Sequence, residues 1–203
     1  MLTRYSEARL PTPYGEFRVV VYRTGDAGGA GASAIGLDHE EHVAMVMGDV
    51  AGSDVLARVH SSCFTGEVMS SLRCDCRAQL DAALARIGRE GRGVLVYLVQ
   101  EGRGIGLGNK VRAYQLQDEG QDTVEANLAL GFEADGRSYD LAAGILADLG
   151  VTSIRLMTNN PAKQAGLVGA GVKVDVLESH WVGASEHNAD YLEAKRIKLG
   201  HLP

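Results

Sequence analysis

The run Val94-Leu-Val-Tyr-Leu-Val99 is the feature that most limits the folds open to this chain. An unbroken apolar run predicts a strand that is buried on both faces, because a strand with one wet face alternates polar and apolar residues. Residues 77–90, just before it, have apolar positions at helical spacing and end at Gly91. Strand and helix patterns alternate from residue 77 onward. The sequence therefore predicts an α/β fold, with an α+β-like mixed sheet flanked by helices.

The other expected elements follow from the same two periodicities. Ser138 is a candidate N-cap for one helix, and Asn160-Pro161 is typical of the start of another. No internal repeat or linker interrupts the pattern, so we expect a single domain over residues 1–203. The expected strands are 15–23, 42–48, 54–60, 153–157 and 172–177; the expected helices are 109–119, 138–149 and about 185–199; a Gly/Ala-rich mobile loop is expected at about 24–40.

Charge and cysteine usage exclude several classes of protein. The formal net charge is −6, which argues against nucleic-acid binding, since such proteins carry a basic surplus. No apolar run reaches the roughly 18–20 residues of a membrane helix, and the N-terminus has no apolar signal region. Three cysteines cannot all pair within one chain. We therefore expect no membrane partner and a location in the reducing cytoplasm.

All three cysteines, Cys63, Cys74 and Cys76, fall within one short stretch. Three thiolates can hold Zn²⁺ and leave its fourth position to water, the arrangement of catalytic zinc, whereas a structural site has four protein ligands. His60 is a candidate fourth ligand because it lies three residues before the first thiol. The alternative is unliganded cytosolic thiols. The spacing alone leaves a closed site, an open site and no site all possible.

A glycine-rich segment, Glu101 to Lys110, follows the buried strand and precedes a helix. Its glycines fit neither the dinucleotide fingerprint nor the Walker loop, so both become less favoured. It is either a flexible connector or a place where the backbone approaches a ligand closely. Cations near these motifs would form a polyphosphate pocket if they converge, with Thr158 at a strand end beside them. They are Arg58, Arg73, Arg103, Lys110, Arg112, Arg137 and Lys163.

Together these motifs resemble the GTP cyclohydrolase II family over nearly the whole chain. The residues that carry the resemblance are Leu10–Phe17, Arg58–Cys63, Ser71–Cys76, Gln100–Leu107, Asn109-Lys110, Ala113-Tyr114, Asp122–Asn127, Gly131-Phe132, Thr158–Pro161 and Gly200-His201.

The resemblance implies hydrolysis of GTP to 2,5-diamino-6-(5-phosphoribosylamino)pyrimidin-4(3H)-one 5'-phosphate, formate and diphosphate, the first step of riboflavin biosynthesis. It implies Zn²⁺ held by Cys63, Cys74 and Cys76, Mg²⁺ held with the triphosphate, and a homodimer of the monofunctional form. It assigns catalysis to Asp135, Arg137 and Tyr114, with Asp135 as acid/base and Arg137 as nucleophile. The GTP-contacting positions are Arg58, Val59, His60, Ser61, Ser62, Gln79, Glu101, Gly102, Arg103, Thr123, Thr158 and Lys163, so His60 becomes a substrate contact.

Three alternatives remain beside this interpretation. Arg137 either becomes a covalent nucleophile or only stabilises charge while water attacks, because a guanidinium is a permanently protonated group. Ser62 stands where the family usually has Glu. That departure is either harmless or the sign of a paralogue in a specialised pathway that releases the ring-opened formamide. A non-catalytic nucleotide-binding homologue is the third alternative, against which the intact thiols and Tyr114 argue.

Overall fold

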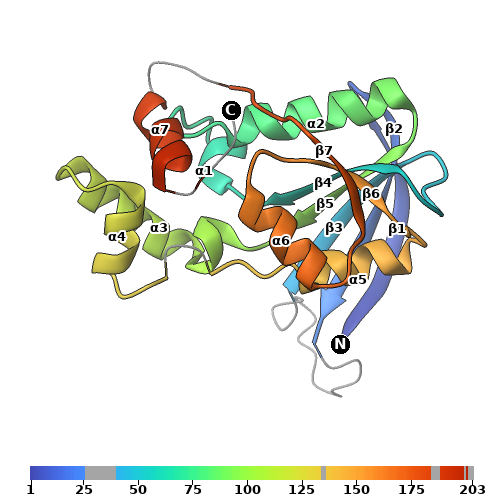
Figure 1. The fold of residues 1–203 in the computed structure, drawn as a ribbon, viewed down its shortest axis with the longest axis horizontal. Helices are drawn as coiled ribbons and strands as arrows, with labels where there is room; N and C mark the ends of the chain where they lie inside the picture. Colours follow the sequence, from blue (N-terminus) through green and yellow to red (C-terminus); the bar gives the residue numbers. More distant parts are fainter. Residues whose placement is uncertain (26–39, 134–135, 184–187, 199, 201–203) are drawn as a thin grey trace.

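A computed structural model describes residues 1–25, 40–133, 136–183, 188–198 and 200 (Figure 1). The strands in these ranges form one mixed sheet in the order β1-β2-β3-β5-β4-β6-β7. This arrangement confirms the predicted α/β fold with a mixed sheet. The strands are β1 (Leu2–Thr12), β2 (Gly15–Thr24), β3 (Glu40–Met47), β4 (Val55–Ser61), β5 (Gly93–Leu98), β6 (Ile154–Met157) and β7 (Val174–Glu178).

The sheet has two halves with different strand directions. β1, β2, β3 and β5 pair antiparallel, whereas β5, β4, β6 and β7 run parallel. Parallel strands place their carboxyl ends on one edge of a sheet, where ligands of open α/β sheets bind. The segments that follow β4, β5 and β6 therefore emerge side by side.

Helices cover both faces of the sheet, while α3 and α4 extend beyond its edge (Figure 1). Leu95 on β5 packs with Ile87 of α2, and its neighbour Val96 packs on the opposite face with Ile145 of α5. The apolar run 94–99 is thus explained by a strand covered on both sides. The helices are α1 (Phe64–Glu67), α2 (Cys76–Glu90), α3 (Gly106–Asp118), α4 (Thr123–Ala129), α5 (Asp140–Asp148), α6 (Pro161–Gly169) and α7 (Ala189–Lys198), with a 3-10 turn η1 (Glu101–Gly104) before α3.

Most expected elements are confirmed, with four differences. β1 was not expected, because its residues are mostly exposed and lack apolar alternation. α1 and α4 are too short to give a periodic pattern. α3 begins at Gly106, three residues earlier than expected. The N-cap of α5 is Tyr139 and not Ser138, although the Ser138 hydroxyl accepts the Asp140 N–H at 3.2 Å.

Parts of the expected loop and C-terminal helix lie outside the described residues. These are residues 26–39 of the loop, and residues 185–187 and 199 of the helix. Within the described part, α7 spans Ala189–Lys198. No helix in the described ranges is long and apolar enough to cross a lipid bilayer.

Candidate functional site

A cavity of about 680 Å³ opens at the edge where the parallel strands end. Its floor comes from the last residues of β4 and from the turn between β6 and α6, and one wall comes from η1 and α3. All three cysteines line it, together with cationic side chains from β4, η1, α3 and α6. The topology thus brings together motifs that lie up to a hundred residues apart in the chain.

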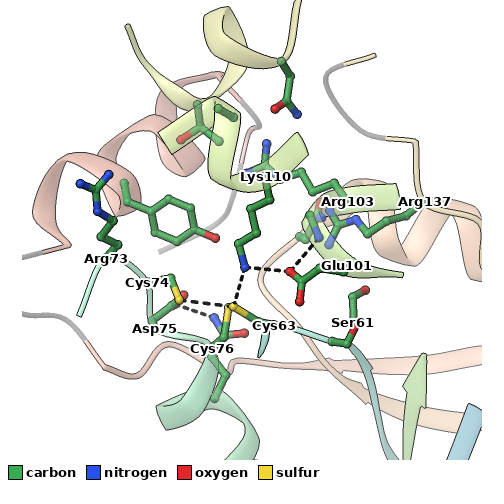
Figure 2. A pocket seen from close by; sticks show the side chains of 18 of the residues that line it. Ser61, Cys63, Arg73, Cys74, Asp75, Cys76, Glu101, Arg103, Lys110 and Arg137 are labelled. Atoms are coloured by element: carbon green, nitrogen blue, oxygen red, sulfur yellow. Dashed lines mark hydrogen bonds and ion pairs between the residues drawn. The ribbon is translucent and has the colours of Figure 1, made fainter. Parts of the chain in front are cut away.

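The three thiols form a single cluster (Figure 2). Cys63 follows β4, Cys76 is the first residue of α2, and all three Sγ atoms lie within 4.8 Å of one another. Gly66 backs the cluster, because a Cβ there would stand 2.8 Å from the Cys74 Sγ and 3.2 Å from the Cys63 Sγ. The close approach of the thiols therefore depends on glycine at this position.

Electrostatics at the cluster favour a bound cation. Hydrogen bonds from Cys74 and Cys76, with help from the Lys110 ammonium, lower the pKa of the Cys63 thiol. The interaction with Cys63 raises the pKa of both Cys74 and Cys76, so the three do not ionise together by themselves. A metal ion removes this conflict, since coordination takes thiols in their deprotonated form. Three soft thiolates at this spacing are consistent with a zinc site.

His60 is not a member of the thiol group. Its Nε2 lies 2.8 Å from Oε1 of Glu67, and burial lowers the pKa of the imidazole, so the neutral ring donates to the carboxylate. Among the described His, Cys, Asp and Glu residues, the cluster includes only the three cysteines. Within the described residues the cluster thus offers three ligand atoms for a metal, and His60 is not a fourth.

Glu101 and Lys110 form a pair beside the first thiol (Figure 2). The Lys110 Nζ lies 2.8 Å from Glu101 Oε1 and 3.1 Å from the Cys63 Sγ. Burial opposes the charge on Lys110, but the Glu101 carboxylate and the Cys63 sulfur outweigh it and raise its pKa. Glu101 also accepts the backbone N–H groups of Phe64 at 2.6 Å and Gly102 at 2.9 Å.

Tyr114 of α3 faces the same end of the cavity. Its hydroxyl lies 3.2 Å from the Thr65 Oγ1, and the Arg73 guanidinium stands 4.9 Å from its ring centroid. Burial raises the pKa of the phenol, so it is a neutral hydroxyl at pH 7. A neutral phenol near the thiols can donate one hydrogen bond and accept another.

Buried cations form the cavity floor. The Arg58 guanidinium donates to the Met157 carbonyl at 2.7 Å and to Gln79 Oε1 at 2.5 Å. The Lys163 ammonium donates to the Val59 carbonyl at 2.7 Å. Arg58 and Lys163 are only 5% and 4% exposed, so their charges act on the cavity with little screening by water.

The predicted site residues fall into three groups. Val59 does not line the cavity but is fully buried in the core, and it contributes only its carbonyl. Asp135 lies outside the described residues. The other predicted positions line the cavity: Arg58, His60, Ser61, Ser62, Cys63, Cys74, Cys76, Gln79, Glu101, Gly102, Arg103, Tyr114, Thr123, Arg137, Thr158 and Lys163.

Several lining residues were not assigned to the site by sequence reasoning. Lys110 was counted among the cations near the motifs, but its bond to a thiol could not be foreseen. His180 donates to the Gln79 carbonyl at 2.8 Å, and the neighbouring Trp181 and Tyr191 of α7 also line the cavity. They belong to the C-terminal region, where no motif pointed to a ligand.

Comparison with known proteins gives a consistent result. A family model described as GTP cyclohydrolase II matches residues 3–178. The riboflavin biosynthesis protein RibBA of Salinispora tropica is 54% identical over 199 residues, which cover 97% of this chain and 47% of the relative. RibBA of Bacillus mycoides is 52% identical over 203 residues, covering 100% and 48% respectively. This chain therefore spans about half the length of these curated relatives.

One solved structure shows a more distant likeness. It is the crystal structure of RibBX, a two domain 3,4-dihydroxy-2-butanone 4-phosphate synthase from A. baumannii. The TM-score is 0.44 at 21% identity, over 89% of this chain and 40% of that chain. A likeness at this level bears on neither the site nor its chemistry.

Proposed function

Because this chain belongs to the GTP cyclohydrolase II family, we propose that it hydrolyses GTP to 2,5-diamino-6-(5-phosphoribosylamino)pyrimidin-4(3H)-one 5'-phosphate, formate and diphosphate. This is the first step of riboflavin biosynthesis. The observation that carries the proposal is the convergence of three thiols, the Glu101–Lys110 pair and Tyr114 in one cavity with a cationic floor. A guanine nucleotide needs these parts together: an activated water for the ring, polar groups for the base and positive charge for the phosphates.

In this proposal Cys63, Cys74 and Cys76 hold the zinc. Zinc held by three protein ligands would supply an acidified water at neutral pH. The protein supplies the position: Gly66 lets the sulfurs approach one another, and Tyr114 stands within reach as a neutral donor. Two successive hydrolyses, of the imidazole ring and then of the formamide, use the same location.

Glu101 is proposed to accept the guanine N1–H and amino group, since a carboxylate can receive both together. Its oxygens already accept hydrogen bonds from Lys110, Phe64 and Gly102. A carboxylate has about four acceptor positions, so base recognition requires at least one of these contacts to be exchanged. Lys110 is the natural one to exchange, because a side-chain ammonium moves more easily than a backbone N–H.

The triphosphate is proposed to lie over the cationic floor. Lys163 and Thr158 flank the N-terminus of α6, whose Asn160 side chain caps the Ala162 N–H at 3.0 Å. A helix N-terminus and buried cations both favour an anion. We propose that Mg²⁺ binds mainly through the triphosphate oxygens, because Mg²⁺ prefers phosphate and water ligands.

Diphosphate release is assigned to Asp135 and Arg137. Arg137 lines the cavity, and we propose that it meets the α-phosphate in one of two roles. As a covalent nucleophile it must first lose a proton, the task given to Asp135; as a charge stabiliser it stays protonated while water attacks. Trapping a phosphoramidate on Arg137 in single-turnover reactions would establish the covalent role.

Because of Ser62, release of a different product remains an alternative. Its hydroxyl oxygen is buried without a hydrogen-bond partner within the described part of the protein, at a position where the family usually carries Glu. A paralogue in a specialised pathway would release the ring-opened formamide. The presence of Tyr114 beside the thiol segment supports complete turnover, in which formate is released and the pyrimidine precursor of riboflavin is formed.

We also propose a homodimer in the cytoplasm, with no nucleic-acid or membrane partner. Three free thiols in one cavity fit a reducing compartment, where they stay available to a metal. The dimer follows from the family resemblance.

The test is a product balance. The purified zinc-loaded protein is incubated with GTP and Mg²⁺, and formate, diphosphate and the pyrimidine are measured by mass spectrometry. We expect one formate and one diphosphate for each GTP consumed. A formate yield near zero would replace the main proposal with the formamide-releasing alternative, and undetectable GTP turnover with zinc bound would defeat both.

A further inference from the structure

Glu67 is a buried carboxylate that the proposed chemistry does not use. It lies between the first and second thiols in the sequence, at the end of the short helix α1, and its side chain is only 6% exposed. A carboxylate is rarely buried unless several donors compensate the lost hydration. Its contacts therefore indicate what the residue does.

Two donors from neighbouring strands hold the carboxylate. His60, at the end of β4, approaches Oε1 at 2.8 Å, and the Tyr97 hydroxyl of β5 donates to Oε2 at 2.6 Å. The His60 and Tyr97 rings stack at 5.8 Å between centroids, so the two donors are fixed relative to each other. The side chain of Glu67 thus anchors α1 to the sheet.

The backbone of the same residue ties together the two segments that carry thiols. Its N–H donates to the Cys63 carbonyl at 2.8 Å, and its carbonyl accepts the Arg77 guanidinium at 3.0 Å. Arg77 directly follows Cys76. One residue therefore links the first cysteine, the segment after the third cysteine and the sheet, and a Cβ on the neighbouring Gly66 would meet the thiols.

We infer that Glu67 is the positioning residue of the metal centre: anchored to His60 and Tyr97, it holds Cys63 at the spacing from Cys74 and Cys76 that a metal needs. This inference rests on the metal centre of the proposed function but not on GTP turnover. A purely structural carboxylate would lower stability when changed and leave metal affinity as it was. A positioning residue changes metal affinity itself, and groups that orient metal ligands typically contribute about 10–100-fold.

The experiment compares Glu67→Gln with Glu178→Gln as a matched control. Glu178 is a partly buried carboxylate with two cationic partners, Arg86 and Arg155, and it stands at the end of β7, outside the segments that carry the thiols. Zinc affinity is measured by competition with a chromophoric chelator, the Co²⁺-loaded proteins are compared by absorption spectroscopy, and the unfolding of each metal-free protein is followed by heating.

We expect Glu67→Gln to weaken zinc binding about tenfold and to shift the Co²⁺ absorption bands, because charge-assisted hydrogen bonds become neutral ones of about half the strength. Glu178→Gln is expected to lower the melting temperature and leave zinc affinity within twofold of the unchanged protein. Equal zinc affinities for Glu67→Gln and the unchanged protein, or equal losses in both variants, would overturn the inference.

Tyr97→Phe keeps the test decisive if Glu67→Gln does not fold. It removes one of the two anchoring bonds and is expected to weaken zinc binding by about threefold or more; unchanged affinity in this variant would likewise overturn the inference. An unchanged protein that binds zinc but does not turn over GTP would defeat the proposed function and leave the role of Glu67 intact.

Discussion

The floor and the α3 wall of the cavity are built in different ways. The floor is made of strand ends, and its cations Arg58 and Lys163 are buried and bonded to carbonyls of neighbouring segments. The wall is a helix beyond the edge of the sheet that packs mainly on η1 and α4. Its functional side chains, Lys110 and Tyr114, reach the thiols through polar contacts.

This difference separates two kinds of contribution to function. Side chains of the floor are fixed by the same contacts that stabilise the fold, so changing them affects both folding and binding. Side chains of the wall contact other site groups and few core residues, so changing them should affect binding while the fold is maintained. The thiol cluster joins the two regions, because Cys63 follows a floor strand and contacts Lys110 of the wall.

Removing a thiol is expected to have the largest effect, since it breaks the junction between floor and wall. Cys76→Ala leaves two ligands for a metal that needs three, so we expect loss of stoichiometric zinc and a fall in GTP turnover of at least about 10³-fold. Metal analysis and steady-state kinetics measure both. An exposed change at the far end of the same helix, Arg89→Gln, should keep zinc and activity. Full zinc content in Cys76→Ala would contradict the three-thiol site.

A pair of substitutions tests the floor against the wall directly. Arg58→Met leaves the Met157 carbonyl and Gln79 without their buried donor, so we expect a loss of about 1–3 kcal/mol in the free energy of unfolding together with weakened GTP binding. Lys110→Met should change GTP binding, because it removes the ammonium that the base displaces from Glu101. The stability loss should stay below about 1 kcal/mol, because the partners Glu101 and Cys63 border the open cavity. Chemical denaturation and nucleotide titration measure the two effects. Equal stability losses would remove the distinction between floor and wall.

The buried His180, which lines the same cavity, should also make stability depend on pH. Burial, with a smaller contribution from Arg58, lowers the pKa of His180 to about 4 from an ordinary value of 6.5. Between these values the unfolded chain binds more protons than the folded one, so stability is fully present above pH 6.5 and is lost as pH falls toward 4. This loss is on the order of 3 kcal/mol.

His180→Gln should reduce this loss by the contribution of one titrating group, as measured by denaturation at several pH values between 7 and 4. His42 and His60, whose pKa values burial also lowers, contribute to the slope that remains in that variant. A pH slope identical to that of the unchanged protein would show that His180 does not titrate on unfolding.

The sequence predicted the parallel half of the protein better than the rest. Buried strands such as β5 and the Asn160-Pro161 helix start depend on local patterns that tertiary contacts reinforce, and both are confirmed. β1 was not predicted, because an edge strand with charged, exposed residues lacks the apolar alternation by which a strand is recognised in the sequence.

For the site, the cysteine spacing and the family resemblance identified many of the residues that line the cavity but not how they contact one another. Whether His60 meets the metal or a carboxylate depends on Glu67 and Tyr97, which are on different elements. The Lys110 contact with Cys63 depends likewise on how α3 is placed against the end of β4. Such pairings are set by the packing of the elements, and no spacing along the chain encodes them.

The smallest expected effect concerns Trp181, the single tryptophan of the chain, which lines the cavity and is 40% exposed. It is held between two fixed points, because His180 is bonded to Asn159 and Gln79, and Gly183 leaves no room for a Cβ beside Ala78. The fluorescence of an indole ring on so fixed a segment should change when a nucleotide binds between floor and wall, while the ring itself contributes little to the affinity.

We therefore expect GTP to quench the Trp181 fluorescence saturably, with Trp181→Phe changing the affinity for GTP by no more than about threefold. The titration is repeated with Lys110→Met, which acts on the opposite wall and should shift the midpoint of the quench while leaving its amplitude. A quench that is absent at saturating GTP would mean that the nucleotide stays on the α3 side, away from the C-terminal residues that line the cavity.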